Sequence, residues 1–492
     1  MVTRYLAYLS KIIKRRNDMR NLTLLTDFYE LTMMYGFMKT GLDKKQAIFD
    51  IFYRPTPHMN YAVACGLEQA IDYIENIKFT EDDIEYLRGL NTFGEDFFDR
   101  LRDFKFTGDI YAVPEGTVVF PYEPIMTIKA PLFEAQLLET TLLNILNHQT
   151  LIASKASRIV YAARGKGVME FGLRRAQGPD AGYYGARAAM ISGCVGTSNV
   201  LTAKQLNVPV SGTHAHSWIM SFGDELTAFR NYAAIYPNSC VLLVDTYDTL
   251  KSGVPNAIKV FDELRLAGYE PVGIRLDSGD LAYLSKQARN MLDEAGYPNA
   301  KIIASGDIDE YVINSLNVQG ARIDTYGIGT KLITSHNNPS LGGVYKLAAI
   351  EEDGEMVNRI KVSDTLEKIT NPGFKTVYRI YKDGKAAADL IALRSESYDV
   401  TKPLTITHPI ETWKKTTFTN YEMKELSVQI YSGGKLVYDR PSIEEIIAYA
   451  KDSIDSLWEE YKRISNPHEY KVDLSDELRE EKKRILETNR EA

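Results

Sequence analysis

Hydrophobic positions along the first third of the chain follow two different spacings. Residues 26–40 and 67–77 carry apolar side chains at helical spacing, whereas residues 48–53 and 125–129 form short apolar runs typical of strands. A longer helical pattern over residues 131–152 has the spacing of a buried helix that leads into the next part of the chain. We therefore expect an N-terminal α+β domain over residues 21–150.

The middle of the chain alternates regularly between short apolar runs and stretches with helical spacing. This alternation indicates βα units and a parallel sheet. The strand-like runs lie at residues 168–171, 191–195, 208–210, 241–244, 272–276, 301–304, 322–326 and 344–348. Eight such runs favour an α/β barrel of parallel strands as the catalytic domain over residues 151–350, and a doubly wound open sheet is the alternative.

The last part of the chain has a mixed pattern. Residues 374–381 and 427–431 are strand-like runs before turn signals, and helical spacing returns over residues 443–464. The highly charged residues 474–492 predict a solvated helix. We expect a C-terminal mixed α+β region over residues 351–492.

Residues 1–20 combine apolar and basic side chains, such as Tyr5 and Ile12 beside Lys11. A targeting or membrane-surface helix is one interpretation of this segment. However, Met19 directly precedes the first fold-like sequence, and no small-residue cleavage site follows. We therefore expect an extension outside the fold.

Composition narrows the kind of partner and compartment. The chain has 492 residues, 44% of them hydrophobic, and a net charge of -8, so it has no overall basic field for nucleic acid or anionic lipid. Its three cysteines are widely separated, as in proteins of a reducing cytoplasm. Charges interrupt every apolar run before the roughly 18 residues that a membrane span needs. We expect a cytoplasmic protein with a small-molecule partner.

Seven of the strand-like runs end in polar and glycine residues. These clusters read Glu170-Phe-Gly-Leu-Arg-Arg, Gly196-Thr-Ser-Asn, Gly212-Thr-His-Ala-His, Asp245-Thr-Tyr-Asp, Arg275-Leu-Asp-Ser-Gly-Asp, Ser305-Gly-Asp and Gly327-Ile-Gly-Thr. Loops after strands are commonly polar and glycine-rich, so one cluster alone says little. Because the carboxyl ends of parallel strands lie at one face of a sheet, seven clusters in register favour an active site.

The cluster from Arg275 to Asp280 is the most informative. A guanidinium can hold an anion with two hydrogen bonds, while the carboxylates of Asp277 and Asp280 can bind sugar hydroxyls or a hydrated Mg²⁺. A capped turn is the alternative, since Asp and Ser commonly begin helices.

Phosphate can be held by the glycine-rich clusters that follow. Gly306 with Asp307, and Gly327 with Gly329 and Thr330, expose backbone N–H groups without side-chain obstruction. A tight turn would require glycine at these positions equally well.

Two of the seven histidines, His214 and His216, stand together after a strand-like run. A metal site would need a third ligand, which the sequence does not reveal. A histidine beside Asp245 and Asp248 can also act as nucleophile, acid or base, held in one tautomer by a carboxylate. We favour such a role for one of the pair, and a structural histidine is the alternative.

These motifs resemble a known family. Thr26-Asp-Phe-Tyr-Glu-Leu-Thr, the clusters that begin at Glu170, Gly196, Gly212, Asp245 and Arg275, and their order over residues 21–350 are similar to nicotinate phosphoribosyltransferase. The resemblance implies the barrel-type phosphoribosyltransferase fold. It also implies a homodimer with shared active sites, in which the N-terminal domain of one subunit completes the site of the other.

The resemblance implies roles for the pyridine-binding residues. Phe171 would cover one face of the pyridine ring and Tyr29 of the partner subunit the other, as stacking suits a flat heterocycle. Arg174 would lie near the ring and the phosphates, and Arg275 with Asp277 near the ribose. In related enzymes that use nicotinamide, an Asp is expected at the position of Ser198. A carboxylate there would repel nicotinic acid, so the neutral Ser198 favours the acid as substrate.

The resemblance also implies a reaction. Phosphoribose would pass from phosphoribosyl pyrophosphate to nicotinic acid, giving nicotinate mononucleotide and pyrophosphate for NAD synthesis. ATP would phosphorylate His216, with Asp245 expected to orient the imidazole. Mg²⁺ would enter with the pyrophosphate, with Asp277 or Asp280 as its protein ligands.

Three other functions stay open on the sequence alone. Nicotinamide or quinolinate phosphoribosyltransferase is one, although quinolinate should demand more basic residues. A barrel aldolase or isomerase acting on sugar phosphates would need a Schiff-base lysine or a glutamate base, for which Lys331 and Glu170 are the candidates. A metabolite-binding barrel without catalysis is the third, and it would not require the carboxylates beside Arg275.

Overall fold

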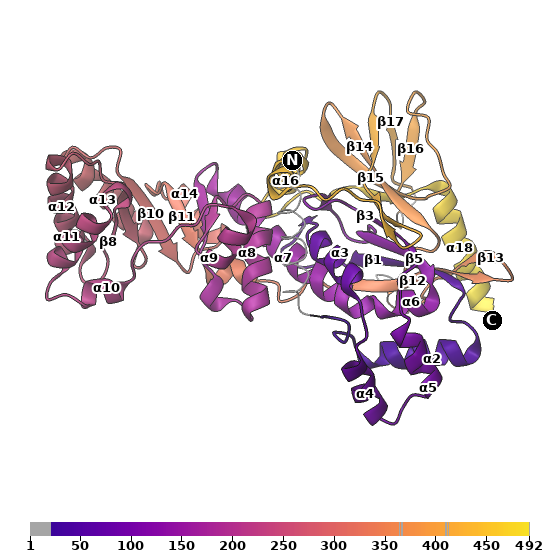
Figure 1. Cartoon of the computed structure of the whole chain (residues 1–492). Coiled ribbons are helices and arrows are strands. Elements are labelled where there is room, and N and C mark those ends of the chain that lie inside the picture. Colours follow the sequence, from indigo (N-terminus) through magenta and orange to yellow (C-terminus); the bar gives the residue numbers. More distant parts are fainter. Residues whose placement is uncertain (1–20, 364, 366–367, 409–410, 412, 492) are drawn as a thin grey trace, which may run out of the picture.

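The computed structural model describes residues 21–363, 365, 368–408, 411 and 413–491. Figure 1 shows an elongated molecule, with a parallel sheet at one end and antiparallel sheets at the other. The N-terminal extension expected over residues 1–20 lies outside the described residues. In the part of the chain that is described, no helix has the length and apolar character needed to cross a membrane.

An antiparallel sheet of seven strands is the centre of the larger lobe (Figure 1). In spatial order its strands are β13 (Glu355–Asn358), β12 (Gly343–Glu352), β1 (Gln46–Tyr53), β5 (Met126–Pro131), β3 (Asp109–Ala112), β19 (Val428–Ser432) and β20 (Lys435–Leu436). The sheet therefore draws strands from the N-terminal, middle and C-terminal parts of the chain.

Helices surround this sheet, and the longest of them leads into the smaller lobe. They are α2 (Phe28–Thr40), α3 (Leu67–Asn76), α4 (Glu81–Gly89), α5 (Glu95–Arg102), α6 (Leu132–Leu137) and α7 (Glu139–Ala163), and a small sheet pairs β2 (Ala62–Val63) with β4 (Val118–Val119). Most residues of α7 from Gln149 onward are buried, in agreement with the apolar spacing of the sequence. The helix runs eleven residues further than the pattern over residues 131–152 predicts.

The parallel sheet of the smaller lobe has six strands. In spatial order they are β7 (Gly196–Thr197), β6 (Gly167–Glu170), β11 (Thr325–Ile328), β10 (Lys301–Gly306), β9 (Gly273–Leu276) and β8 (Val241–Leu243). The helices between them are α8 (Pro179–Ile191), α9 (Val200–Leu206), α10 (His216–Met220), α11 (Glu225–Ile235), α12 (Val254–Leu266), α13 (Leu281–Glu294), α14 (Glu310–Val318) and α15 (Thr330–Ile333). The predicted α/β architecture with parallel strands is confirmed.

A closed barrel is not shown by the backbone pairing. One parallel bridge joins Thr197 to Val210, so the run at residues 208–210 lies beside β7 without forming a full strand. In the described pairings β8 has one strand neighbour, β9. By its backbone hydrogen bonds the sheet is therefore open, with β7 and β8 as its edge strands.

Two of the eight expected barrel strands are corrected by the structure. Residues 344–348 belong to β12, which pairs antiparallel with β1 in the larger lobe. Ile191 ends α8, and the residues after it form a turn before β7. Both errors have one cause, because a short apolar run does not reveal which sheet it joins or whether it is the end of a buried helix.

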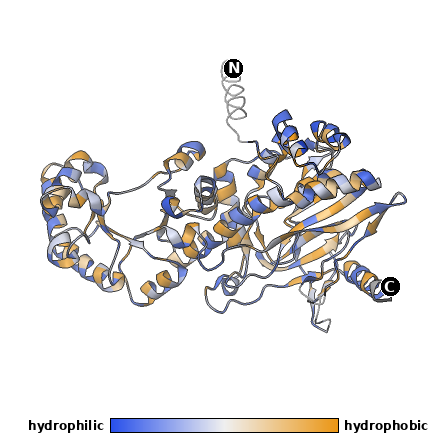
Figure 2. Cartoon of the chain, turned by 90° about the horizontal axis from the view of Figure 1, so that it is seen from below, coloured by the Kyte–Doolittle hydropathy of each residue, from blue (hydrophilic) through white to orange (hydrophobic). Residues whose placement is uncertain are grey.

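The C-terminal region adds a second antiparallel-rich sheet and three helices. The spatial order of this sheet is β17 (Lys415–Phe418), β16 (Leu404–Thr407), β21 (Val472–Leu474), β15 (Lys385–Leu393), β14 (Lys375–Lys382) and β18 (Glu422–Glu425). The helices are α16 (Ile443–Asp455), α17 (Glu459–Lys462) and α18 (Asp476–Glu491). Figure 2 shows hydrophobic residues concentrated on the strands of this lobe and on the inner sides of its helices.

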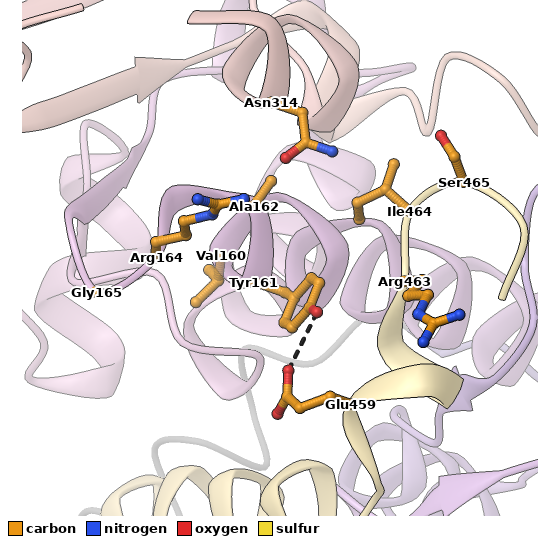
Figure 3. A pocket seen from close by; sticks show the side chains of 10 residues that line it. All are labelled: Val160, Tyr161, Ala162, Arg164, Gly165, Asn314, Glu459, Arg463, Ile464 and Ser465. Atoms are coloured by element: carbon orange, nitrogen blue, oxygen red, sulfur yellow. Dashed lines mark hydrogen bonds between the residues drawn. The ribbon is translucent and has the colours of Figure 1, made fainter. Parts of the chain in front are cut away.

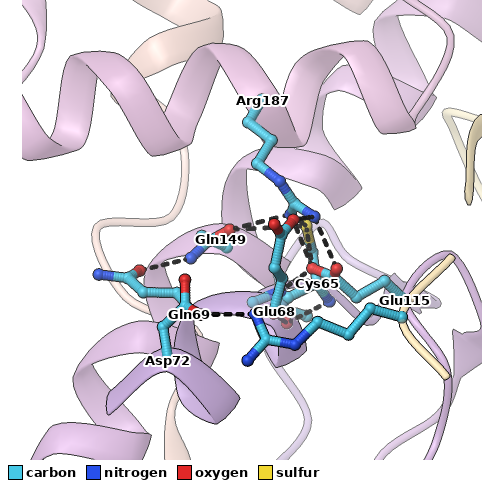
Figure 4. Close-up of polar contacts among 10 residues, drawn as sticks. Cys65, Glu68, Gln69, Asp72, Glu115, Gln149 and Arg187 are labelled. Atoms are coloured by element: carbon cyan, nitrogen blue, oxygen red, sulfur yellow. Dashed lines mark hydrogen bonds and ion pairs between the residues drawn. The ribbon is translucent and has the colours of Figure 1, made fainter. Parts of the chain in front are cut away.

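A buried polar cluster fastens the two lobes together (Figure 4). Arg187 on α8 places Nη2 2.7 Å from Glu115 Oε2 and 2.7 Å from Glu68 Oε2. Burial alone would raise the pKa of Glu115, but the Arg187 charge and hydrogen bonds lower it. Glu115 also accepts a hydrogen bond of 2.6 Å from the backbone N–H of Gly66. The ion pair thus fixes α8 against the start of α3.

Candidate active site

The carboxyl ends of the parallel strands converge, as the register of the sheet requires. Leu276 is level with Ala304 on β10, and Gly327 on β11 is level with Ser305 and with Met169 on β6. The loops that follow these strands therefore begin at one face of the sheet.

Arg275 is the centre of the hydrogen bonds at this face. Its guanidinium donates to Ser305 Oγ at 2.7 Å, to Thr213 Oγ1 at 2.9 Å and to Asp277 Oδ1 at 2.8 Å. The guanidinium carbon also lies 5.8 Å from the centre of the Phe171 ring. Because the guanidinium is planar, three acceptors from different loops fix its orientation.

Asp277 is held as a carboxylate beside this guanidinium. Burial alone would raise the pKa of Asp277, but the Ser305 hydrogen bond and the Arg275 charge lower it. Its other oxygen, Oδ2, lies 3.8 Å from His216 Nε2. Asp277 therefore stands between a fixed cation and the accessible histidine.

Asp245 binds the loop that carries Asp277. Its Oδ2 accepts hydrogen bonds from the Asp277 backbone N–H at 3.0 Å and from Ser278 Oγ at 2.6 Å. Its Oδ1 is buried without a hydrogen-bond partner among the described residues. A buried carboxylate oxygen without a donor is costly, so this atom is suited to a ligand that brings a donor or a cation.

His216 opens α10 with its side chain 39% exposed. Its Nδ1 lies 3.1 Å from Thr246 Oγ1. The sequence predicts that Asp245 orients this imidazole, but the structure gives that position to Thr246. Asp245 is turned instead toward Asp277 and Ser278.

His214 has the features of a structural histidine. It is buried, and its Nε2 accepts a hydrogen bond of 3.3 Å from the backbone N–H of Leu243. Its ring meets Tyr232 edge-on with the ring centres 4.6 Å apart. Burial lowers its pKa to about 4, so the ring is neutral near pH 7. Of the pair, His216 is the one available for chemistry.

Glycine is required here because other groups approach closely. A side chain at Gly327 would place Cβ 2.6 Å from the Phe171 ring, and one at Gly329 would place it 2.9 Å from the Phe171 carbonyl oxygen. Gly306 has a φ of 109°, and its Cβ would lie 2.6 Å from the Asp277 carbonyl oxygen. These glycines bring the loops together, whether or not their N–H groups also bind phosphate.

Glu170 is a buried brace between two of the loops. It accepts a hydrogen bond of 2.6 Å from Thr197 Oγ1 and another from the backbone N–H of Gly172. The Ser198 backbone N–H donates to the Glu170 carbonyl at 2.9 Å, which places Ser198 beside the strand that carries Phe171. With both carboxylate oxygens occupied, Glu170 is unsuited to the role of an isomerase base.

Other predicted residues lie on the same loops with fewer contacts. Arg174 is exposed in the 3-10 turn η1 (Leu173–Arg175), and Asp307 is exposed after β10. Asp280 caps α13 by accepting a hydrogen bond of 3.0 Å from the Tyr283 N–H, as the capped-turn alternative expects. Thr330 is the first residue of α15.

Lys331, the candidate Schiff-base lysine of the aldolase alternative, is ion-paired. Its Nζ lies 3.2 Å from Asp309 Oδ2. Schiff-base formation requires an amine that is free to attack a carbonyl, whereas the Lys331 amine is engaged by Asp309.

Tyr29 is not brought to this face within one chain. It lies on α2 in the larger lobe, far from β8 to β10 (Figure 1), with 45% of its surface exposed. Burial raises the pKa of its hydroxyl to about 12, with the Glu139 charge adding to the effect. Phe28, beside it, is also an exposed aromatic, at 50%.

Metal binding by the protein alone is not supported. Among the described residues, no group of three or more His, Cys, Asp or Glu side chains is arranged to hold a metal ion. Asp277 Oδ1 is already occupied by Arg275 and Ser305, and Asp280 caps a helix. The free Asp245 Oδ1 fits only a cation that also has ligands from a bound substrate.

Three residues that complete this site were not singled out from the sequence. Thr213, Thr246 and Ser305 orient Arg275 and His216. All three lie inside the polar clusters after the strands, so position at a strand end is the signal that would have found them. The sequence alone does not distinguish them from other Ser and Thr residues, which are common in turns.

Comparisons with known proteins match most of the chain. Models of nicotinate phosphoribosyltransferase match residues 24–147 (its N-terminal domain), 167–385 (the family model) and 374–482 (its C-terminal domain). Nicotinate phosphoribosyltransferase of Bacillus subtilis is 51% identical over 93% of this chain and 94% of that protein. The human protein of that name is 31% identical over 92% of this chain and 95% of its own.

Solved structures give the same result for the fold. Human nicotinic acid phosphoribosyltransferase superposes with a TM-score of 0.83 at 29% identity, covering 94% of this chain and 99% of that one. Nicotinate-nucleotide pyrophosphorylase of Pyrococcus furiosus, at 22% identity and a TM-score of 0.68, shares the fold. On the family models and on relatives that match nearly its whole described length, the chain belongs to the nicotinate phosphoribosyltransferase family.

Proposed function

We propose that the chain transfers phosphoribose from phosphoribosyl pyrophosphate to nicotinic acid, giving nicotinate mononucleotide and pyrophosphate for NAD synthesis. The observation that carries the proposal is the Arg275 guanidinium, which joins Asp277, Ser305 and Thr213 beside the Phe171 ring. Such a site holds an aromatic ring and an anionic sugar next to each other. Membership of the family gives the substrates.

Nicotinic acid would lie against Phe171, with Ser198 near its carboxylate. The Ser198 backbone N–H bonds the Glu170 carbonyl, so Ser198 lies beside the end of β6, directly after which Phe171 follows. An acidic side chain there would repel the substrate. This argument favours nicotinate over nicotinamide.

The second ring face would come from another subunit. Four apolar side chains are exposed at the start of α2 and just before it, namely Leu25, Phe28, Tyr29 and Met33. Exposed apolar patches of this kind mark interaction surfaces. A homodimer in which α2 covers the parallel sheet of the partner would place Tyr29 opposite Phe171 and complete the site.

The phosphoribosyl group would lie over the loops after β9, β10 and β11. Asp277 and Arg275 are suited to the ribose hydroxyls and the phosphate. The backbone N–H groups of Gly306, Asp307, Gly329 and Thr330 would donate to phosphate oxygens. Arg174 adds an exposed positive charge at the rim.

Bond breaking needs charge stabilisation more than proton transfer. As pyrophosphate leaves the anomeric carbon, positive charge develops on the ribosyl group and is stabilised by the Asp277 carboxylate. The pyridine nitrogen then attacks, and it carries no proton, so no general base is required. Magnesium bound with the pyrophosphate would supply neutralising charge. Asp245 Oδ1, with Asp277 or Asp280, would be its protein contacts.

ATP coupling would act through His216. The imidazole is accessible at Nε2 and held at Nδ1 by Thr246, so phosphoryl transfer to Nε2 leaves the ring in place. A phosphoryl group on Nε2 would add negative charge close to Asp277. This repulsion would reorganise the loops, which links the state of His216 to substrate binding.

We also propose that the parallel strands form a barrel, and that the enzyme is cytoplasmic. The Val210 bridge extends the sheet beyond β7, and the His214 side chain bonds the Leu243 backbone of β8. The segment from Val210 to His214 thus contacts both edge strands of the sheet, β7 and β8. We take these two contacts as support for a barrel that is closed by this segment.

The test is an assay of mononucleotide formation with phosphoribosyl pyrophosphate and Mg²⁺. Nicotinate, nicotinamide and quinolinate are supplied in turn, with and without ATP. We expect product from nicotinate and a higher rate with ATP. Product from nicotinamide alone would overturn the Ser198 argument, and equal rates with and without ATP would remove the coupling.

A further inference from the structure

A cavity lies away from the loops of the candidate active site, at the other end of β6. It has a volume of about 670 Å³ and is formed where the end of α7, the middle of α14 and the segment after α17 meet (Figure 3). Arg164 and Gly165 follow α7 and precede β6, whereas Phe171, proposed to bind the pyridine ring, follows that strand. The strand therefore separates this cavity from the catalytic face.

The acidic group in the cavity wall is already neutralised. Glu459 pairs with Lys462 Nζ at 2.7 Å and accepts a hydrogen bond of 3.1 Å from the Tyr161 hydroxyl. The Lys462 hydrogen bond, the largest cause, lowers the pKa of Glu459. The carboxylate among the residues that line the cavity is therefore already paired.

The remaining polar groups of the cavity have no partner among the described residues. No carboxylate lies within ion-pair distance of Arg164 or Arg463, and neither the Asn314 amide nor the Ser465 hydroxyl has a hydrogen bond within the described chain. Figure 3 shows the Arg164 guanidinium and the Asn314 amide directed into the same space. Arg164 and Arg463 are both exposed where they border the cavity, so their guanidinium groups are open to a ligand in a protein whose net charge is -8.

The backbone at Arg164 is in a conformation that a side chain makes costly, which provides a variant for the test below. Arg164 ends α7 with φ 51° and ψ 52°, in the left-handed region. Glycine or asparagine is preferred at such helix ends, because a larger side chain costs free energy there. Arg164 is exposed, so its side chain can reach a ligand without breaking an ion pair within the described chain.

We propose that this cavity binds a phosphate-bearing molecule of nucleotide size. Free guanidinium groups recognise phosphate with paired hydrogen bonds. The cavity is within the size range of small-molecule sites and far exceeds a phosphate ion. Tyr161, Val160 and Ile464 supply an aromatic and apolar surface for a base. A nucleoside monophosphate satisfies both requirements.

Because the catalytic face also takes phosphates, the test must distinguish the two sites. Arginines are labelled with phenylglyoxal in the intact protein, and labelling is measured peptide by peptide with AMP, adenosine or inorganic phosphate present. We expect AMP to slow labelling of Arg164 and Arg463 at least fivefold, adenosine to have no effect, and phosphate to act weakly. Arg230, an exposed arginine on α11, should label equally in every arm.

Two outcomes would overturn the proposal. Protection by AMP confined to Arg174 and Arg275 would show that nucleotide binds the catalytic face alone. Protection by phosphate as strong as by AMP would show that the cavity holds an anion and does not recognise a nucleoside.

A variant provides a second test that does not depend on labelling. Arg164→Gly removes the side chain and relieves the left-handed backbone, so we expect an equal or higher melting temperature. The AMP concentration that gives half-maximal protection of Arg463 should rise at least tenfold. Asp353→Gly is the matched control, because Asp353 has a φ of 51° in the turn between β12 and β13, away from the cavity. Unchanged protection in Arg164→Gly would contradict the proposal.

Discussion

Arg275 and Asp277 stand on either side of Leu276 at the end of β9, and Arg275 Nη2 lies 2.8 Å from Asp277 Oδ1. Both side chains meet at Ser305, which accepts from Arg275 and donates to Asp277. Charge, orientation and distance are thus fixed before any substrate binds. Such preorganisation is what stabilises a charged transition state.

Replacing Arg275 with lysine tests this geometry without removing the charge. A lysine amine on a flexible stem cannot donate to Ser305, Thr213 and Asp277 in the fixed plane of a guanidinium. We expect Arg275→Lys to lower kcat/KM by about 100-fold or more, because each charge-assisted hydrogen bond lost costs about 1.5–3 kcal/mol. Steady-state kinetics with nicotinate as the varied substrate measure the loss. Arg230→Lys, in a surface pair with Glu263, is the control and should retain full activity.

The Phe171 ring should be sensitive to the residue at position 327. In Gly327→Ala the added methyl would lie 2.6 Å from the ring, so the ring must turn or shift. Small displacements of a substrate-binding group have large effects, and we expect the KM for nicotinate to rise roughly tenfold. Gly223→Ala, where nothing lies within 4 Å of the new methyl, should leave the KM unchanged. An unaltered KM in Gly327→Ala would remove Phe171 from the pyridine site.

Glu30 on α2 predicts a dependence of stability on pH. Burial raises its pKa to about 7, although hydrogen bonds from Thr140 and Thr26 act in the other direction. Because the folded protein holds this proton more tightly than the unfolded chain, stability falls as pH rises from the usual carboxyl range through about 7. Glu30→Gln removes this titration. The melting temperature of the variant minus that of the wild type should therefore increase by a few degrees as the pH rises from 5 to about 8.

Thermal unfolding at several pH values measures this difference. The comparison is informative because Glu30 accepts a hydrogen bond of 2.9 Å from the Thr140 N–H, which a glutamine oxygen can replace. Parallel curves for the two proteins over this pH range would show that Glu30 does not titrate there.

Local structure was largely predictable from the sequence. The helical spacing over residues 26–40 matches α2, and the apolar run over residues 48–53 matches β1. The polar clusters after the parallel strands predicted that residues such as Arg275 and His216 meet at one face, because strand direction determines which ends lie together. These features depend on neighbours in sequence and on one general rule of sheet topology.

Long-range pairing was not predictable in the same way. Residues 344–348 have the pattern of a buried strand in either sheet, and only the register with β1 assigns them to the larger lobe. The prediction that Asp245 orients His216 was also wrong. Thr246 takes that position, because Asp245 and Thr246 are adjacent and face different loops. Spacing brings a set of side chains to one end of a sheet but does not determine which pairs form.

The junction between the lobes should depend on the balance of charges around Arg187. In Arg187→Met, Glu115 stays buried without its partner, and leaving a buried charge unpaired costs about 3–5 kcal/mol. In Arg187→Met/Glu115→Gln no buried charge is left at position 115, and the glutamine oxygen can still accept from the Gly66 N–H. The double variant should therefore be more stable than the single variant.

Urea denaturation of the wild type, both single variants and the double variant measures the coupling between the two positions. Residues in direct contact deviate from additivity, and here the deviation should be favourable by about 1–3 kcal/mol. Additive losses would mean that Arg187 stabilises α8 by packing alone. Glu68 is the internal check, because it is 30% exposed and water can replace Arg187 there, so Glu68→Gln should cost far less than Glu115→Gln.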